Sequence, residues 1–274
     1  MKGDPQISAL HLYGEGLIPE PGIQEIIRYL NRWMKGRNID FRGNLFRYHL
    51  SSLPKQERPE RIQRLAEELA LLRVRDATRR DSDDRRPMEG ELAYEKRRIE
   101  GEGFKSFGIL YDGFGLQRIF SSLISDDELS VNHCHIIFTN QLFGTWDDHD
   151  HRYHARVSVY GFPSLVSTTG VVEAPAKPRE FYLKKRLGIP LEVLKSEFRG
   201  RFIDHGDHHL TEAVKGYVMQ ALFFQMTGNP FCDDPDCRLF NAHWQEELIR
   251  AQLGGRYEFC PKHQGILNRI EAEV

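Results

Sequence analysis

The chain has 274 residues, of which 40% are hydrophobic and 28% are charged, a balance typical of a folded globular protein rather than a disordered one. The 38 Lys and Arg residues and 40 Asp and Glu residues give a net charge of -2, which argues against a general nucleic-acid binder. Because the sequence shows neither a signal-peptide pattern nor an apolar run long enough to span a bilayer, we expect a cytoplasmic protein without a membrane partner.

The first fifty residues follow a strand, helix, strand pattern. Residues 7–13 alternate as a strand does, apolar residues then recur at helical spacing from 23 to 34, and residues 39–50 are predicted to form a second strand. This order is typical of an α/β layer.

A charged segment separates this layer from the rest of the chain. Residues 58–77 have a helical apolar stripe, whereas residues 78–103 mix acidic and basic side chains. We interpret residues 55–103 as a charged helical and loop insertion. Its arginines could contact a polyanion, but the acidic residues among them favour a mobile, solvated loop.

The central segments again alternate between strands and helices. Strands are predicted at 107–111, 131–138, 155–160 and 165–172, and helices at 116–124, 191–198, 211–227 and 242–252. The helix at 211–227 is apolar on most sides and ends at Gly228, so we expect it to be buried. The expected fold class is α/β, a mixed sheet flanked by helices within one domain of residues 1–274.

Three of the four cysteines lie close to a histidine near the C-terminus. Cys232 and Cys237 are followed after 22 residues by Cys260 and His263. Two close pairs of such ligands suit tetrahedral zinc, although buried reduced cysteines with accidental spacing are the alternative. We predict one structural zinc per chain in the segment 229–267, because four protein ligands leave no open coordination position.

The segment before this cluster resembles the archaemetzincins, a family of metzincin-like zinc metallopeptidases. Their motif reads HExxHxxGxxHC, then four residues, then CxM, and later CxxC. Gly228, Cys232 and Cys237 match this motif in register, and His263 replaces the last cysteine. Weaker similarity extends over residues 105–264. The resemblance implies a metzincin-like fold and hydrolysis of peptides by a zinc-activated water.

The catalytic part of that motif is absent. The family's HExxH falls on Ala221-Leu-Phe-Phe-Gln225, so Ala221 and Gln225 replace two ligand histidines and Leu222 replaces the general-base glutamate. Phe231 stands at the third histidine, and Leu239 at the methionine. These side chains cannot hold a catalytic zinc as three imidazoles do.

A relocated metal site is one hypothesis. If residues 205–212 are helical, His205, His208, His209 and Glu212 share one face, and His205, His209 and Glu212 could bind a second zinc with water at the fourth position. His208 or Asp207 would then be the base. Gly206 favours the alternative, a polar loop.

Other histidines are also candidates. His133 and His135 share one face of their predicted strand and form either a metal-binding pair or a hydrogen-bonded pair. The loop 146–154 is rich in ligand types, and together with 204–212 it would line a cleft if the two stretches meet.

Three functions remain open from the sequence. The first is an archaemetzincin-like metallopeptidase, and the second is an inactive relative that uses the old cleft to bind a peptide or protein partner. The third, a zinc-ribbon-like nucleic-acid binder, rests on Arg238, Arg250, Arg256 and Lys262 near the cysteines, and the near-neutral charge counts against it. The sequence indicates neither the substrate nor the oligomeric state.

Overall fold

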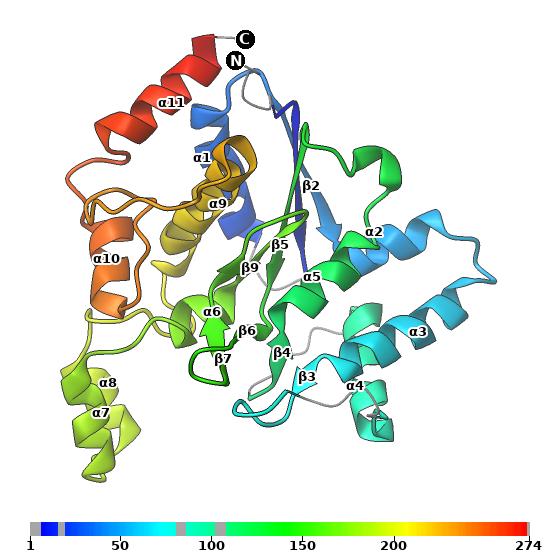
Figure 1. Ribbon diagram of the computed structural model, residues 1–274, viewed down its shortest axis with the longest axis horizontal. Coiled ribbons are helices and arrows are strands. Elements are labelled where there is room, and N and C mark those ends of the chain that lie inside the picture. Colours follow the sequence, from blue (N-terminus) through cyan, green and yellow to red (C-terminus); the bar gives the residue numbers. More distant parts are fainter. Residues whose placement is uncertain (1–6, 16–19, 81–85, 102–107, 273–274) are drawn as a thin grey trace.

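The computed structural model describes residues 7–15, 20–80, 86–101 and 108–272 (Figure 1). Two mixed β-sheets lie between two groups of helices, so the predicted α/β class with a mixed sheet flanked by helices is confirmed. Within the described ranges, none of the helices has the length and apolar character needed to cross a bilayer.

The larger sheet has the strand order β2-β1-β5-β9-β8. Its strands are β1 (Ala9–Gly14), β2 (Asn38–Asn44), β5 (His133–Thr139), β8 (Ser158–Val159) and β9 (Ser164–Ser167). The pairs β1–β2, β1–β5 and β5–β9 are parallel, and β8 runs antiparallel to β9 at one edge. This sheet brings together segments from the first fifty residues and from the middle of the chain.

The smaller sheet has the order β3-β4-β6-β7. Its strands are β3 (Arg73–Val74), β4 (Leu110–Asp112), β6 (Leu142–Asp147) and β7 (Arg152–Arg156). β4 and β6 are parallel, whereas β3 and β7 pair antiparallel at the two edges. Gly144 in β6 allows close approach of β7, because a Cβ atom there would lie 2.7 Å from the backbone oxygen of His154.

One face of the larger sheet packs against α1 and α9. Leu10, Leu12, Ile136 and Phe138 point to this face and are buried with apolar residues of both helices. The helices on this side are α1 (Glu20–Trp33), α6 (Thr168–Glu173), α9 (Leu210–Thr227), α10 (Gln245–Leu253) and α11 (Pro261–Ala272). As predicted, α9 is buried along most of its length, and it ends at Gly228 with φ of 74°.

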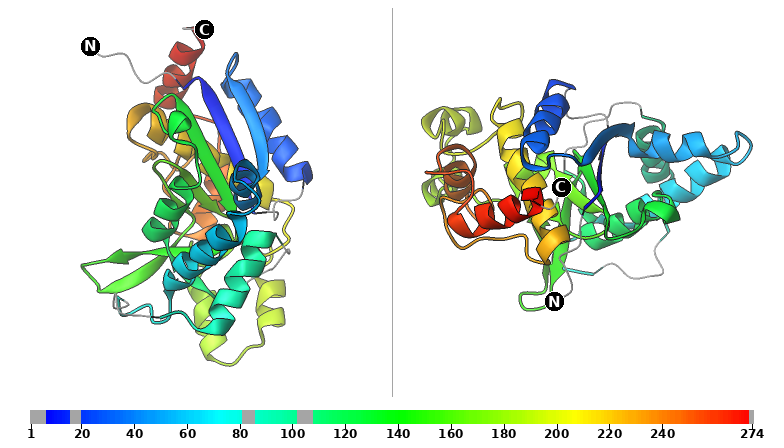
Figure 2. Two further views of the ribbon diagram at one scale, coloured as in Figure 1. Left: turned by 90° about the vertical axis from the view of Figure 1, so that its right-hand side faces the viewer. Right: turned by 90° about the horizontal axis from the view of Figure 1, so that it is seen from above.

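The opposite face of the same sheet packs against a second core. Tyr13, Ile137 and Leu165, which alternate with the residues of the first face, are buried there with the smaller sheet. The helices on this side are α2 (Leu45–Ser52), α3 (Arg58–Leu71), α4 (Glu89–Glu100) and α5 (Gly113–Ser121), and the short 3-10 helix η1 (Asp126–Glu128) precedes β5. Figure 2, seen from above, shows α1 and α9 on one side of the strands and α2 and α3 on the other.

A small helical hairpin lies apart from both cores. It consists of α7 (Arg179–Arg186) and α8 (Leu191–Glu197) and has its own cluster of buried aromatic residues and Leu194. It lies at the lower left of Figure 1, below α10.

Two of the predicted strands are too long. The strand expected over 39–50 ends at Asn44, whose side chain accepts a hydrogen bond from the Arg47 backbone N–H and thereby caps α2. The strand expected over 165–172 ends at Ser167, which caps α6 in the same way through the Gly170 N–H. In both segments a capping side chain stops the strand although the apolar pattern continues.

The expectation of a mobile, solvated loop over 78–103 is wrong for the described residues 89–100, which form α4. Three of its charged side chains, Glu91, Glu95 and Arg98, are buried and pair with opposite charges. Arg98 Nη2 lies 2.6 Å from Glu15 Oε1, and Arg98 Nη1 lies 3.2 Å from Glu95 Oε2. Residues 81–85 and 102–107 of this predicted insertion lie outside the described residues.

Candidate metal centre

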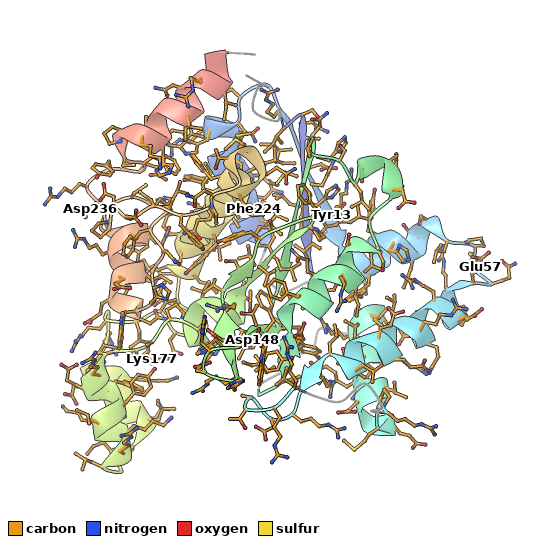
Figure 3. The ribbon with its side chains drawn as sticks, viewed as in Figure 1. Tyr13, Glu57, Asp148, Lys177, Phe224 and Asp236 are labelled. Atoms are coloured by element: carbon orange, nitrogen blue, oxygen red, sulfur yellow. The ribbon has the colours of Figure 1, made fainter. Side chains whose placement is uncertain are left out.

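Cys232, Cys237, Cys260 and His263 meet at one point of the structure, as the sequence predicts. Cys232 follows the end of α9, and the Cys237 backbone N–H closes a turn on the Asp234 carbonyl. Cys260 immediately precedes α11, and His263 lies in its first turn. The intervening α10 returns the chain, so the two loops face each other near Asp236, which is labelled in Figure 3.

The distances within this Cys3His cluster suit a zinc ion. Cys232 Sγ lies 3.8 Å from Cys260 Sγ, and His263 Nδ1 lies 3.8 Å from Cys237 Sγ and 3.1 Å from Cys260 Sγ. Tetrahedral zinc with ordinary bond lengths separates two sulfur ligands by about 3.8 Å and sulfur from nitrogen by about 3.5 Å. The donor set and its spacing therefore fit tetrahedral zinc.

Burial affects the protonation of these side chains. Burial raises the pKa of the Cys237 thiol to about 12, and it raises the pKa of Cys232 as well. Burial lowers the pKa of His263, which keeps its ring neutral and able to donate a lone pair. A cation among these groups provides the charge that stabilises the thiolate ligands.

The four positions of the lost catalytic motif hold no metal site. Ala221 and Leu222 are fully buried in the core. Gln225 is also buried, and its Nε2 donates a hydrogen bond to the Val131 carbonyl at 2.8 Å. Phe231 packs edge-on against Tyr160, with ring centroids 5.9 Å apart. A catalytic zinc at this place does not fit the residues present, as the sequence indicates.

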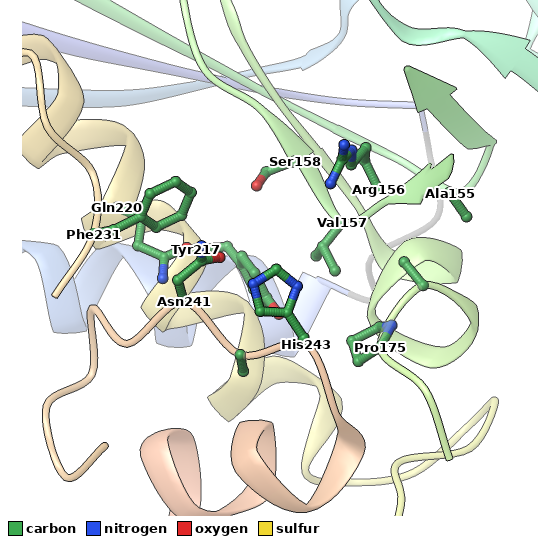
Figure 4. Close-up of a pocket in the computed structure, with 12 residues that line it drawn as sticks. Ala155, Arg156, Val157, Ser158, Pro175, Tyr217, Gln220, Phe231, Asn241 and His243 are labelled. Carbon is green, nitrogen blue, oxygen red and sulfur yellow. The ribbon is translucent and has the colours of Figure 1, made fainter. Parts of the chain in front are cut away.

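A cleft nevertheless lies beside α9 (Figure 4). Tyr217 and Gln220 of α9 line it, and Phe231 is also part of its lining. Its other lining residues are Ala155, Arg156, Val157, Ser158, Ala174, Pro175, Asn241, Ala242 and His243. Its volume is about 120 Å³, which is below the roughly 300–1,000 Å³ of enclosed small-molecule sites.

The hypothetical helical face of His205, His208, His209 and Glu212 does not form, and the segment is instead the polar loop that Gly206 favours. Residues 205–206 and 208–209 are turns, Gly206 has φ of 80°, and α9 begins only at Leu210. The glycine at positive φ and the local Asp207 contacts explain this, because both favour turns over helix.

The three candidate ligands His205, His209 and Glu212 therefore each contact different partners instead of meeting at one point. Glu212 pairs with Arg238 at 2.7 Å and with Lys215 at 2.5 Å. His205 lies 3.4 Å from Glu173. Asp207, His208 and His209 do lie together, and the His209 Nδ1–Asp207 Oδ1 distance is 2.9 Å, but both histidines are exposed.

The loop 146–154 also has a local arrangement of its own. Asp147, Asp150 and His154 form a partly exposed group, in which His154 Nε2 lies 2.8 Å from Asp150 Oδ2. Among the described residues that line the cleft, none belongs to 146–154 or to 204–212. The cleft beside α9 is therefore built from other segments and is not a cleft between these two stretches.

A third histidine joins His133 and His135. His11 of β1 lies beside them on β5, and the ligand atoms of the three side chains lie within 4.8 Å of one another. Burial lowers the pKa of His135 to about 4, so its ring is neutral at physiological pH. Alternation within the strand predicted at 7–13 would have placed His11 on the face of Tyr13, but the sequence does not show which strand is its neighbour.

The chain was compared with known families, curated proteins and solved structures. Residues 6–270 match the model of a family described as a probable metallopeptidase family (DUF6775). A similar solved structure is an archaemetzincin from Methanopyrus kandleri, with 11% identity, a TM-score of 0.48, and coverage of 98% of this chain and 97% of that one. Another is a zinc-dependent peptidase from Methanocorpusculum labreanum, with 15% identity, a TM-score of 0.43, and coverage of 94% and 100%. Among curated proteins, none matches this sequence.

Proposed function

The chain belongs to a probable metallopeptidase family (DUF6775), and from this we propose that it is a zinc-dependent peptidase that takes its peptide substrate in the cleft beside α9. The family match over residues 6–270 is the observation that carries the proposal. The cleft and the Cys3His cluster support it from the side of the structure.

The proposal includes one structural zinc per chain, bound by Cys232, Cys237, Cys260 and His263. All four positions of a tetrahedral ion are taken by protein, so this zinc holds the two loops together, and peptide hydrolysis would need a second zinc that activates water. Because such thiolates persist under reducing conditions, we also propose a cytoplasmic location.

The cleft suits an extended peptide rather than an enclosed small molecule. β8 is the edge strand of the larger sheet, and within the described part of the chain it pairs with β9 alone. A peptide that lies along this edge can form main-chain hydrogen bonds while one side chain enters the small cleft. Figure 4 shows Asn241 and His243 across the cleft from Arg156 and Ser158, where they offer polar contacts to that side chain.

The composition of α9 favours a second candidate function, in which the peptide is bound but not hydrolysed. Ala221, Leu222 and Gln225 supply neither the zinc ligands nor the base of the family that the motif resembles. No hydrolytic step can therefore be assigned to α9. Binding through the cleft requires none of these groups.

Cleavage and binding of a fluorogenic peptide library separate the two functions. We expect the zinc-loaded protein to cleave library members, and we expect Asn241→Ala and His243→Ala to weaken binding by about 3- to 10-fold each, as for one lost hydrogen bond. His208→Ala, an exposed position outside the cleft, is the control and should leave binding unchanged. Binding that depends on the cleft but is not followed by cleavage would support the second candidate function. If the wild-type protein neither binds nor cleaves the peptides, both candidate functions are contradicted.

A further inference from the structure

Three neighbouring strands place one acidic and two imidazole side chains in a row. In the parallel register, His11 of β1 is opposite Asp40 of β2 on one side and His135 of β5 on the other. Directly paired residues point to the same face, and His133 points there too because it precedes His135 by two positions. This face is the one that carries Tyr13, opposite to the face that packs on α9 (Figure 3).

Hydrogen bonds determine which ring nitrogens carry a lone pair. His11 Nδ1 lies 2.6 Å from Asp40 Oδ1, and His135 Nε2 lies 3.1 Å from the Glu128 backbone carbonyl. Because the carbonyl and the ionised carboxylate only accept hydrogen bonds, these two nitrogens are protonated. The lone pairs are then on His11 Nε2 and His135 Nδ1, the nitrogens available to a metal.

This arrangement is characteristic of metal-binding histidines. Such a histidine usually donates its second ring N–H to a carboxylate or a backbone carbonyl, which orients the ring and increases its basicity. Asp40 does this for His11, and the Glu128 carbonyl does it for His135. His133 Nδ1 donates a hydrogen bond to His11 Nε2 at 2.9 Å, so a metal bound to both nitrogens would move that proton to His133 Nε2. The separation of the two nitrogens is close to the about 3.3 Å between two nitrogens on tetrahedral zinc.

The surrounding charges complement a dication. Asp40 and Glu128 are both held by one guanidinium, with Arg42 Nε 2.8 Å from Asp40 Oδ2 and Arg42 Nη1 2.5 Å from Glu128 Oε2. Two carboxylates and one guanidinium leave one negative charge beside the three histidines. His11 and His135 are only 3% and 4% exposed, whereas Asp40 is 38% exposed, so water screens part of this charge.

We propose that His11, His133 and His135 bind one divalent transition-metal ion, such as zinc, separate from the ion of the Cys3His cluster. Imidazole ligands suit this class of metal, and three of them leave a further coordination position for water or another ligand. Arg42 also donates a hydrogen bond to the Tyr13 hydroxyl at 2.9 Å, and this hydroxyl lies 3.3 Å from His135 Nδ1. The proposed site does not depend on peptide hydrolysis or on the cleft beside α9.

Metal content of the purified full chain tests the proposal directly. After loading with zinc and removal of the excess, we expect two ions per wild-type chain and one per His133→Ala chain, while His209→Ala, in the exposed Asp207 group, should keep two. In the cobalt-loaded proteins the sulfur-to-cobalt absorption of the Cys3His cluster should be equal in all three. One ion per wild-type chain alongside that absorption, or equal content in wild type and His133→Ala, would overturn the proposal.

A second variant leaves the three ligands in place. Asp40→Asn keeps the size of the side chain but removes the carboxylate that orients His11, so we expect cobalt to bind the three-histidine site about 10- to 100-fold more weakly. Competition with a chromophoric chelator measures this affinity, and circular dichroism confirms that the variant is folded. An unchanged affinity in the folded variant would contradict the orienting role of Asp40 and the proposed ligand set.

Discussion

Glu212 shows that a residue with suitable ligand chemistry can serve the fold instead. Its carboxylate lies between Arg238 and Lys215, and Lys215 also contacts Glu25 of α1 at 2.6 Å. These ion pairs therefore connect the start of α9 to α1 and to the loop that carries Cys237. Its residue type and spacing suggest a metal ligand, but its contacts make it part of an ion-pair network.

The first prediction concerns this network and pH. Burial raises the pKa of Glu212, but hydrogen bonds from Lys215 and Arg238 outweigh that effect and lower it below the ordinary 4.5. A lowered pKa in the folded state stabilises the protein above pH 4.5, and this stabilisation is lost as the pH falls through the folded-state pKa. Glu212→Gln should thus be less stable than wild type at neutral pH, and the difference should shrink as the pH falls below 4.5.

Urea unfolding at several pH values measures the effect. Glu60→Gln is the matched control, because Glu60 is 70% exposed and forms an i,i+4 pair with Arg64 on the surface. That change should alter the free energy of unfolding by less than about 1 kcal/mol. A Glu212→Gln variant as stable as wild type at neutral pH would contradict the proposed role of the network.

Arg98 supports a second prediction at the residue scale. It is 5% exposed and lies between the buried carboxylates of Glu15 and Glu95, of which Glu95 also pairs with Arg73 at 2.7 Å. Removal of one partner from a buried ion pair leaves uncompensated charge, so Arg98→Met should cost about 3–5 kcal/mol. Chemical unfolding tests this value, with the exposed Arg64→Met as control, and a loss below about 1 kcal/mol would show that the carboxylates find other compensation.

At the scale of elements, α6 packs against Arg156 and Val157, two residues that line the cleft. Gly170 of α6 packs so closely against this segment that a Cβ atom would lie 2.5 Å from the Arg156 backbone oxygen and 2.9 Å from Val157 Cα. Backbone atoms cannot rotate away as the end of a flexible side chain can. A larger residue at this position must therefore move α6 or the cleft wall.

The third prediction follows from this contact. Gly170→Ala should destabilise the protein by about 1–3 kcal/mol through overpacking and should also weaken peptide binding in the cleft. Gly265→Ala in α11 is the control, since no atom lies within 4 Å of its Cβ position and alanine favours a helix by up to about 1 kcal/mol. Thermal unfolding and peptide titration measure both effects, and identical behaviour of the two variants would exclude the steric explanation.

At the scale of the whole molecule, the Cys3His cluster attaches the C-terminal helices to the main core. The ring of His263 meets Phe223 of α9 edge-on at 5.1 Å, and Leu267 is buried in the same core. We therefore expect binding of the proposed structural zinc, packing of α11 and the buried face of α9 to depend on one another. Loss of the metal should affect this part of the molecule first.

Removal of the metal is the fourth prediction. Chelation should expose α10 and α11 to hydrogen exchange, while the strands of the larger sheet remain protected. Each kcal/mol of lost stability lowers the melting temperature by about 2–4 °C in a chain of this size. We expect a loss of about 3 kcal/mol, and therefore a fall of about 10 °C. Restoration by zinc is the control, and an unchanged melting temperature after verified metal loss would contradict a structural role.

The sequence alone determines the local features of this protein. Three of them are readable from short stretches of sequence: the two close ligand pairs Cys232/Cys237 and Cys260/His263, the glycine stop at Gly228, and the apolar length of α9. Each reflects chemistry that acts within a few residues or one helix. The resemblance that follows from them leads to the metallopeptidase family. The ends of strands were less predictable, because capping by Asn44 and Ser167 competes with an apolar pattern that continues past them.

Only the tertiary structure decides which distant side chains meet. His11 and His133 are 122 positions apart, and they become neighbours because β1 pairs with β5 in one particular register. The burial of Arg98 depends in the same way on Glu15, 83 positions earlier. Strand pairing and charge compensation act across space and leave no fixed interval in the sequence. The cysteine cluster could therefore be found by counting residues, whereas the three-histidine cluster required the folded chain.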